Sequence, residues 1–195
     1  MNSTREELFQ IQRDLQMEAS ELEKLLNLNE LLQRVGKPIR VGSSALGLMV
    51  WRDLDITVVC NDLNIEKIAD IAKDLMASPY IRELKFKNDT GTWNEESHIY
   101  PDGFYFGLKC KSNTNHIWKV DIWFVDQPER QPDLKHIKTI PSRLTPEKKE
   151  IILRIKKAWA EKPEYGSAVT SYLIYKAVLD ENVKSLDEFN SYLKK

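Results

Sequence analysis

The chain has 195 residues, of which 29 are basic and 30 are acidic, so its net charge at neutral pH is −1. A chain of this length buries roughly 70% of its unfolded surface, and it needs neither disulfides nor a structural metal to fold. The near-neutral charge argues against a general grip on long DNA or RNA, which depends on neutralising many phosphates, but it leaves room for a local basic patch and does not exclude tRNA.

The cysteines and the N-terminus indicate the compartment. Cys60 and Cys110 fall in strand-like runs with no partner at a metal-ligand spacing, so we expect reduced cysteines in a core. The N-terminus has no apolar signal region, and no run approaches 18 apolar residues. We therefore expect a cytoplasmic protein with no membrane partner.

A long helix is predicted at the N-terminus. Thr4, with Glu7 three residues later, makes a capping box, and apolar residues recur at helical spacing over residues 8–32, with a possible bend near Asn27. Such a helix packs on the chain's own sheet or joins a partner, for example in a homodimer. Glu18 interrupts the strict heptad, which favours packing within the chain.

The middle of the chain alternates strands with one helix. A helix is expected over 65–75, and a long irregular segment over 88–103. Trp93, His98 and Tyr100 in that segment either stack on a substrate ring or pin the loop to the core. The predicted strands are 37–41, 55–60, 80–87, 104–111 and 116–126.

The last third is predicted to be helical. The prolines between 127 and 144 indicate an irregular linker. Thr145 and Pro146 then start a helix with Ile155 and Ala158 on its buried face, and two shorter helices follow. The resulting division is 1–126 for a sheet domain with its N-terminal helix, 127–144 for the linker and 145–195 for a helical domain.

The segment Val41–Cys60 carries the most specific pattern. Gly42 allows a sharp turn, and Ser43 offers a hydroxyl and an N–H group at the start of a short helix, where phosphate is favoured. After nine intervening residues, Asp53 and Asp55 open a second apolar run. Strand alternation places both carboxylates on one face, about 6–7 Å apart at Cα, and a divalent cation is the simplest relief of their repulsion.

Asp121 is a third carboxylate, placed among Val120, Ile122 and further apolar residues in a later strand. Burying a charge there is costly without a partner. A metal ion shared with the aspartate pair is one such partner, and a lysine or arginine is the other.

The order apolar-Gly-Ser, nine residues, Asp-apolar-Asp-apolar, and then a carboxylate on a later strand resembles the signature of the DNA polymerase β-like nucleotidyltransferase superfamily. The resemblance covers roughly residues 37–125. It implies an α+β (α/β) fold with a mixed sheet flanked by helices, here with a long N-terminal helix and a C-terminal helical bundle. Small antibiotic adenylyltransferases are similar in size and layout.

The resemblance also implies site residues. Asp53, Asp55 and Asp121 would be catalytic and would hold Mg²⁺ or Mn²⁺, with Asp121 also able to take the acceptor's proton. Gly42 and Ser43 would hold the β- and γ-phosphates of a nucleoside triphosphate. Further candidates for nucleotide binding are Ser44, Arg52, Tyr172 and Lys176, although core packing is an alternative for the tyrosine and lysine.

The sequence therefore predicts a metal-dependent nucleotidyltransferase that moves a nucleoside monophosphate, most simply AMP from ATP, onto a hydroxyl of a small molecule. Transfer to tRNA or to a protein, as in toxin-like members of the superfamily, is an alternative. A non-catalytic binding module with the same fold is a third possibility.

Overall fold

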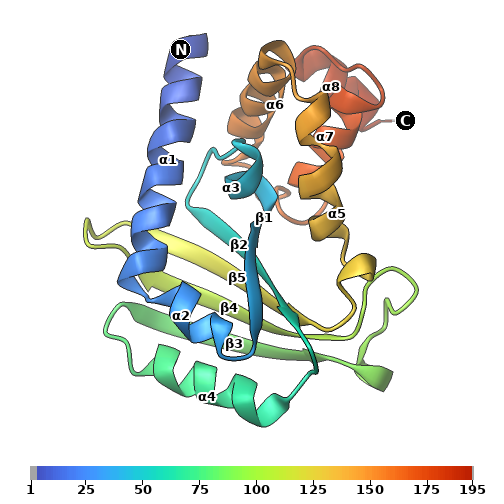
Figure 1. Cartoon of the computed structure of the whole chain (residues 1–195). Helices are drawn as coiled ribbons and strands as arrows, with labels where there is room; N and C mark the ends of the chain where they lie inside the picture. The colour runs from blue at the N-terminus through green and yellow to red at the C-terminus, as the bar shows by residue number, and fades with distance from the viewer. Residues whose placement is uncertain (1–3, 195) are drawn as a thin grey trace.

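The protein is built on a five-stranded mixed sheet with helices on both faces (Figure 1), as a computed structural model describes it for residues 4–194. The strand order is β1-β2-β5-β4-β3, in which β2 and β5 run parallel and the other neighbours are antiparallel. The predicted α+β fold is confirmed. The strands are β1 (Gly36–Val41), β2 (Asp53–Cys60), β3 (Ile81–Asp89), β4 (Gly103–Lys111) and β5 (Ile117–Val125).

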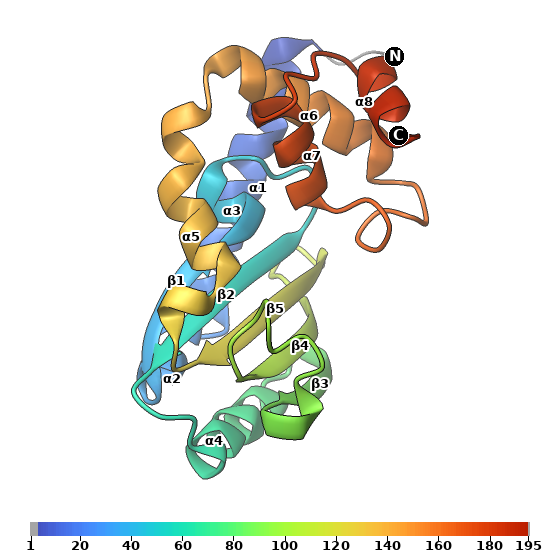
Figure 2. The same cartoon turned by 90° about the vertical axis from the view of Figure 1, so that its right-hand side faces the viewer.

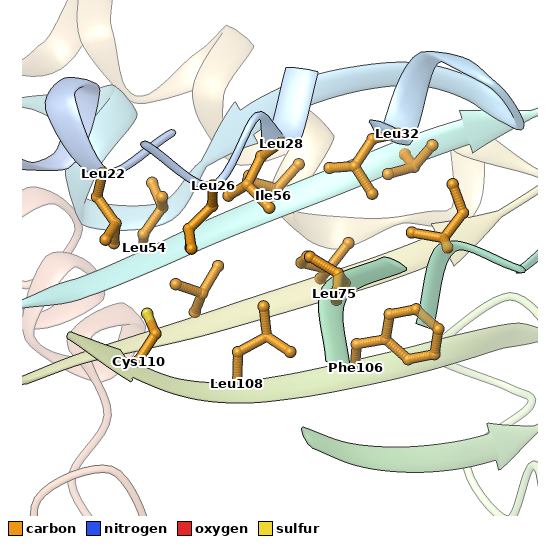
Figure 3. Close-up of a cluster of buried hydrophobic side chains, with 14 of the residues drawn as sticks. Leu22, Leu26, Leu28, Leu32, Leu54, Ile56, Leu75, Phe106, Leu108 and Cys110 are labelled. Carbon is orange, nitrogen blue, oxygen red and sulfur yellow. The ribbon is translucent and has the colours of Figure 1, made fainter. Parts of the chain in front are cut away.

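Three helices cover one face of the sheet and enclose the larger hydrophobic core (Figure 3). Leu22 and Leu75 reach this core from two of them, and Leu75 lies beside Phe106 of β4. Cys60 and Cys110 are free and buried in the same core, as expected, and burial raises the pKa of both thiols to about 11. The helices are α1 (Arg5–Leu25), α2 (Leu28–Gln33) and α4 (Ile65–Met76).

The N-terminal helix starts at the predicted capping box, where the Thr4 hydroxyl accepts from the Glu7 N–H and the Glu7 carboxylate accepts from the Thr4 N–H. It breaks at Asn27, whose φ of 50° is left-handed. Leu15 and Leu22 are buried against the chain's own sheet, so the packing predicted from the heptad break is confirmed. The homodimer stays a prediction.

The remaining helices form a second cluster beside the end of the sheet where β1 meets α3 (Figure 2). Leu8 of α1, Leu46 of α3 and Phe189 of the last helix share its core. These helices are α3 (Gly42–Leu46), α5 (Pro132–Thr139), α6 (Pro146–Trp159), α7 (Ser171–Leu179) and α8 (Leu186–Tyr192).

Two sequence-based expectations in this part need correction. The segment 127–144 is not irregular throughout, because Pro132 begins α5 and the two other prolines begin single 3₁₀ turns. The division into a sheet domain, a linker and a helical domain stays a prediction. Proline lacks an N–H, which costs nothing in a first turn. On α6, Ala158 is exposed, and the buried residue on that side is Lys156.

The segment between β3 and β4 is a loop tied down by Asp102, whose carboxylate accepts from the Gly91 N–H and the Asn94 side chain. Trp93 is not pinned to the core, since 70% of it is exposed. Tyr100 is also exposed. Among the described residues, no helix is both long and apolar enough to cross a membrane.

The break after α1 supplies a test of backbone strain. We expect Asn27→Ala to lower the free energy of unfolding by about 1 kcal/mol relative to Asn27→Gly, because a Cβ in the left-handed region costs roughly 1–2 kcal/mol. Both variants lose the same exposed hydrogen bond from the Asn27 side chain to Glu30. Urea denaturation measures the difference, and equal stability of the two variants would contradict it.

Candidate active site

Three carboxylates meet on one face of the sheet because β2 and β5 are parallel neighbours. Asp55 lies directly opposite Asp121, and Asp53 lies opposite Lys119. Residues that are opposite on adjacent strands point to the same face. One carboxylate oxygen each of Asp53, Asp55 and Asp121 lies within 4.8 Å of the other two. The predicted convergence of the three aspartates is confirmed.

The donor set fits a divalent cation with hard oxygen ligands. Asp53 Oδ1 is buried and accepts no hydrogen bond in the described part of the chain. An oxygen left without a donor in this position costs free energy unless a cation is bound there. Adjacent oxygen ligands of one Mg²⁺ are about 3 Å apart and opposite ligands about 4 Å apart. The three oxygens lie within 4.8 Å of one another, so small side-chain movements would bring them into contact with one ion.

Lys119 and Tyr105 partly compensate the negative charge. Lys119 Nζ is 2.7 Å from Asp121 Oδ2 and 4.0 Å from Asp53 Oδ1, while the Tyr105 hydroxyl donates to Asp121 Oδ1 at 2.6 Å. The lysine partner considered for Asp121 is thus present together with the metal-type cluster. The Lys119 side chain is 63% exposed, so it is free to move off Asp121 when a cation binds.

Burial and mutual repulsion shift the titration of the site. Burial raises the pKa of Asp53, and the charge of Asp121 adds to the rise although Lys119 opposes it. Burial, followed by the charges of Asp53 and Asp121, raises the pKa of Asp55 well above its usual value. Burial works against the charge of Lys119, but the neighbouring aspartates raise its pKa. Without an added cation, the raised pKa values mean that Asp53 and Asp55 hold protons more readily than ordinary carboxylates do.

Gly42 is required by both space and backbone conformation. Its φ is +61°, and a Cβ built there would lie 2.2 Å from Asp55 Oδ2. The turn before α3 therefore touches the carboxylate cluster directly. The sequence-based pairing of the glycine turn with the aspartates is a physical contact in the structure.

The Ser43 hydroxyl faces a fully buried lysine that the sequence analysis missed. Lys156 Nζ donates to Ser43 Oγ at 2.5 Å, to the Leu48 carbonyl at 2.7 Å and to the Tyr175 hydroxyl at 3.2 Å. Burial lowers the pKa of Lys156. The sequence did offer a signal for its burial: Lys156 follows the buried Ile152 by four residues, and residues at that spacing share a helix face.

The other predicted nucleotide-binding residues lie in different surroundings. The Ser44 hydroxyl donates to the Val41 carbonyl at 3.1 Å, inside the protein. Arg52 is held by Glu18 of α1, with bonds of 2.7 and 3.0 Å. Both side chains therefore have structural partners, and their nucleotide contacts stay predictions.

Tyr172 and Lys176 are exposed on α7 beside a cavity of about 370 Å³ between α5 and α7. The Tyr172 ring is stacked on His136 of α5, with ring centroids 4.3 Å apart and planes 17° from parallel. Arg130 and Lys135 also line this cavity. The alternative of packing in the core is therefore wrong for both Tyr172 and Lys176, which are exposed.

Comparison with known proteins identifies the fold. A scan of protein-family models and a search of curated proteins give no match. Among solved structures, Cid1 bound to the UTP analogue UMPNPP is 18% identical, with a TM-score of 0.57 over 90% of this chain and 54% of that one. A cytoplasmic RNA terminal U-transferase is 19% identical, with a TM-score of 0.57 over 89% of this chain and 54% of that one. A STING-associated CdnE c-di-GMP synthase from Capnocytophaga granulosa is 13% identical, with a TM-score of 0.51 over 93% of this chain and 62% of that one.

These neighbours are a poly(U) polymerase, an RNA terminal U-transferase and a c-di-GMP synthase, and the chain shares their fold. The resemblance inferred from the glycine turn and the three aspartates is therefore confirmed at the level of the fold. The chain spans about half the length of the Cid1 structures that it matches, 54% for the UMPNPP complex.

The contact between Gly42 and Asp55 gives the first test of the site. We expect Gly42→Ala to abolish the increase in melting temperature caused by Mn²⁺, because the new Cβ displaces the Asp55 carboxylate. Gly91→Ala is the matched control, since Gly91 also has a positive φ, +56°, but no atom lies within 4 Å of its Cβ position. An intact Mn²⁺ response in Gly42→Ala, measured by thermal unfolding, would contradict the geometry.

A second test uses the raised pKa of Asp55. A raised folded-state pKa gives stability that is present below the unfolded value and lost as the pH rises. Without metal, Asp55→Asn should therefore be more stable than the wild type by on the order of 1 kcal/mol near pH 8, and the difference should shrink toward about pH 4. Urea denaturation across this range measures it. A destabilised variant at about pH 8 would refute the assignment.

Proposed function

We propose that the protein is a metal-dependent nucleotidyltransferase that moves a nucleoside monophosphate from a nucleoside triphosphate onto an acceptor hydroxyl. The observation that carries the proposal is the convergence of Asp53, Asp55 and Asp121 within 4.8 Å, beside the Gly42 turn. AMP from ATP is the donor chemistry expected from the sequence. Because the neighbours are named for a UTP analogue and for c-di-GMP synthesis, the experiment below compares all the common nucleoside triphosphates as donors.

In this proposal the three aspartates hold Mg²⁺ or Mn²⁺. When bound, these ions would offset the negative charge on the triphosphate and lower the pKa of the acceptor hydroxyl. A bond forms between the acceptor oxygen and the α-phosphorus, and the bond from that phosphorus to pyrophosphate breaks. In this mechanism Asp121 would accept the hydroxyl proton, and the bond that the Tyr105 hydroxyl donates to Asp121 Oδ1 would orient its carboxylate.

The surroundings of Ser43 support a triphosphate at the Gly42 turn. The Lys156 ammonium lies directly behind Ser43, and its nearest described partners are neutral oxygens rather than a carboxylate. A buried positive charge without a close counterion favours an anion nearby. Its three bonds also tie α6 and α7 to the turn, so we assign Lys156 as a positioning residue that adds positive potential.

The cavity between α5 and α7 supports the assignment of Tyr172 and Lys176 to nucleotide binding. Its volume of about 370 Å³ is within the range of small-molecule sites. Tyr172 offers an exposed aromatic ring for stacking on a base, and Lys176 offers a positive charge. His136 already covers one face of that ring, so a base would stack on the other face or replace the imidazole.

The proposal is tested by thermal unfolding with each of the common nucleoside triphosphates plus Mg²⁺ or Mn²⁺. A ligand at about 100 times its Kd stabilises the folded state by about 2.7 kcal/mol, which is an increase of several degrees for a chain of this size. We expect Asp53→Asn with Asp55→Asn to remove the increase, and Asp62→Asn, an exposed aspartate on the same chain, to retain it.

Transfer itself is followed with α-labelled triphosphate and a pooled set of hydroxyl acceptors. Label should move to an acceptor with the wild type and not with Asp121→Asn. Stabilisation by a triphosphate without transfer to any acceptor would favour the non-catalytic binding module. No stabilisation by any triphosphate would overturn the proposal.

A further inference from the structure

The triad lies at the margin of an exposed sheet face formed by β3, β4 and β5. The strand register places Lys85, Gly107 and Asp121 in one row across the three strands. Side chains in the same row share a face, so the face that carries Asp121 also carries the odd-numbered residues of β4 and those of β3 from Glu83 onward. The helices α1, α2 and α4 pack on the opposite face (Figure 1).

This face is basic apart from the triad. Its other acidic residues on these strands, Glu83 and Asp89, are each within ion-pair distance of a lysine, with Lys109 Nζ 3.6 Å from Glu83 and Lys87 Nζ 2.7 Å from Asp89. Lysines therefore outnumber carboxylates on the approach to the triad. The lysines of this face are Lys85, Lys87, Lys109, Lys111 and Lys119.

Aromatic rings lie beside the same carboxylates. Tyr105 and Trp123 are neighbours across β4 and β5, with ring centroids 5.0 Å apart, and the Tyr105 hydroxyl bonds Asp121. Aromatic faces next to lysines are typical of surfaces that bind single-stranded nucleic acid, where bases stack and phosphates meet cations.

We infer that this lysine face binds the acceptor, and that the acceptor is a single-stranded nucleic acid whose terminal hydroxyl reaches Asp121. The inference rests on the proposed function, since it names the acceptor of that reaction. A neutral small molecule carries no negative charge that the lysines could bind. A duplex keeps its bases stacked inside and away from Tyr105 and Trp123.

The size of the face sets how much of the strand it contacts. Two strand spacings separate Lys85 on β3 from Asp121 on β5, about 10 Å in all. That distance suits contact with only the last few phosphates of a strand. Such a short footprint is consistent with a net charge of −1, because a local basic patch suffices and a basic chain is not needed.

The experiment measures binding of a single-stranded RNA and a single-stranded DNA, each of about 12 nucleotides with a 5′ label, by fluorescence anisotropy without triphosphate. The test variant is Lys85→Gln with Lys111→Gln, because both lysines are exposed and have no ion-pair partner among the described residues. The control is Lys67→Gln with Lys73→Gln on α4, which removes the same charge from exposed positions on the other side of the sheet.

We expect the test variant to bind about 10-fold more weakly at low salt, and the slope of log Kd against log salt to fall by about 1.4 for two lost phosphate contacts. The control variant should bind as the wild type does. Equal binding by the test variant and the wild type, equal losses in test and control, or tighter binding of a duplex than of a single strand would overturn the inference.

Transfer assays separate this inference from the proposed function. Label transferred to a neutral small molecule or to a protein, with no effect of the lysine substitutions, would overturn the acceptor assignment and leave the transferase intact. Strand binding that depends on Lys85 and Lys111, with no triphosphate response, would overturn the transferase and leave a nucleic-acid-binding surface. Extension of the single strand, reduced in the test variant only, supports both.

Discussion

The repulsion among three carboxylates is the constraint on which the rest of this structure depends. The parallel pairing of β2 with β5 brings Asp55 opposite Asp121, and strand alternation adds Asp53 to the same face. Burial makes the arrangement more costly, as the raised pKa values of Asp53 and Asp55 indicate. Clusters of this kind, which lower stability, are typical of functional sites.

A second buried charge, Lys156, connects the C-terminal helices to the segment beside the aspartate triad. Lys156 connects α6 to the Ser43 hydroxyl and to Tyr175 on α7. The helix α7, which lines the cavity of about 370 Å³, is therefore tied to the segment that touches Asp55. A negative cluster and a buried cation thus stand on either side of Gly42–Ser43. This separation of charge supports the proposal of an anionic substrate that binds together with cations.

Much of this could be predicted from local sequence because the signals are local. The capping box at Thr4, the strand alternation around Asp53 and the glycine before Ser43 each depend on a few neighbouring residues. Glu18 was correctly identified as unfavourable for a heptad, but its role could not be predicted, since it pairs with Arg52 from a distant part of the chain. That pairing also gives the predicted nucleotide-binding Arg52 a structural partner.

The features that the sequence did not predict arise from contacts that depend on the tertiary structure. Lys156 looks like a surface lysine in the sequence, and only the meeting of α6, α7 and the turn gives its ammonium three oxygen partners. The net charge of −1 favoured a small acceptor, yet strand register gathers Lys85, Lys109 and Lys119 on one face. Composition reports the sum of the charges, and only the sheet determines where they lie.

The most direct measurement of the central claim is anomalous diffraction from crystals grown with Mn²⁺ and a non-hydrolysable nucleoside triphosphate. We expect a manganese peak within coordination distance of Asp53, Asp55 and Asp121, with Lys119 moved off the Asp121 carboxylate. A map without a peak at the triad, in crystals where Lys119 still pairs with Asp121, would contradict it.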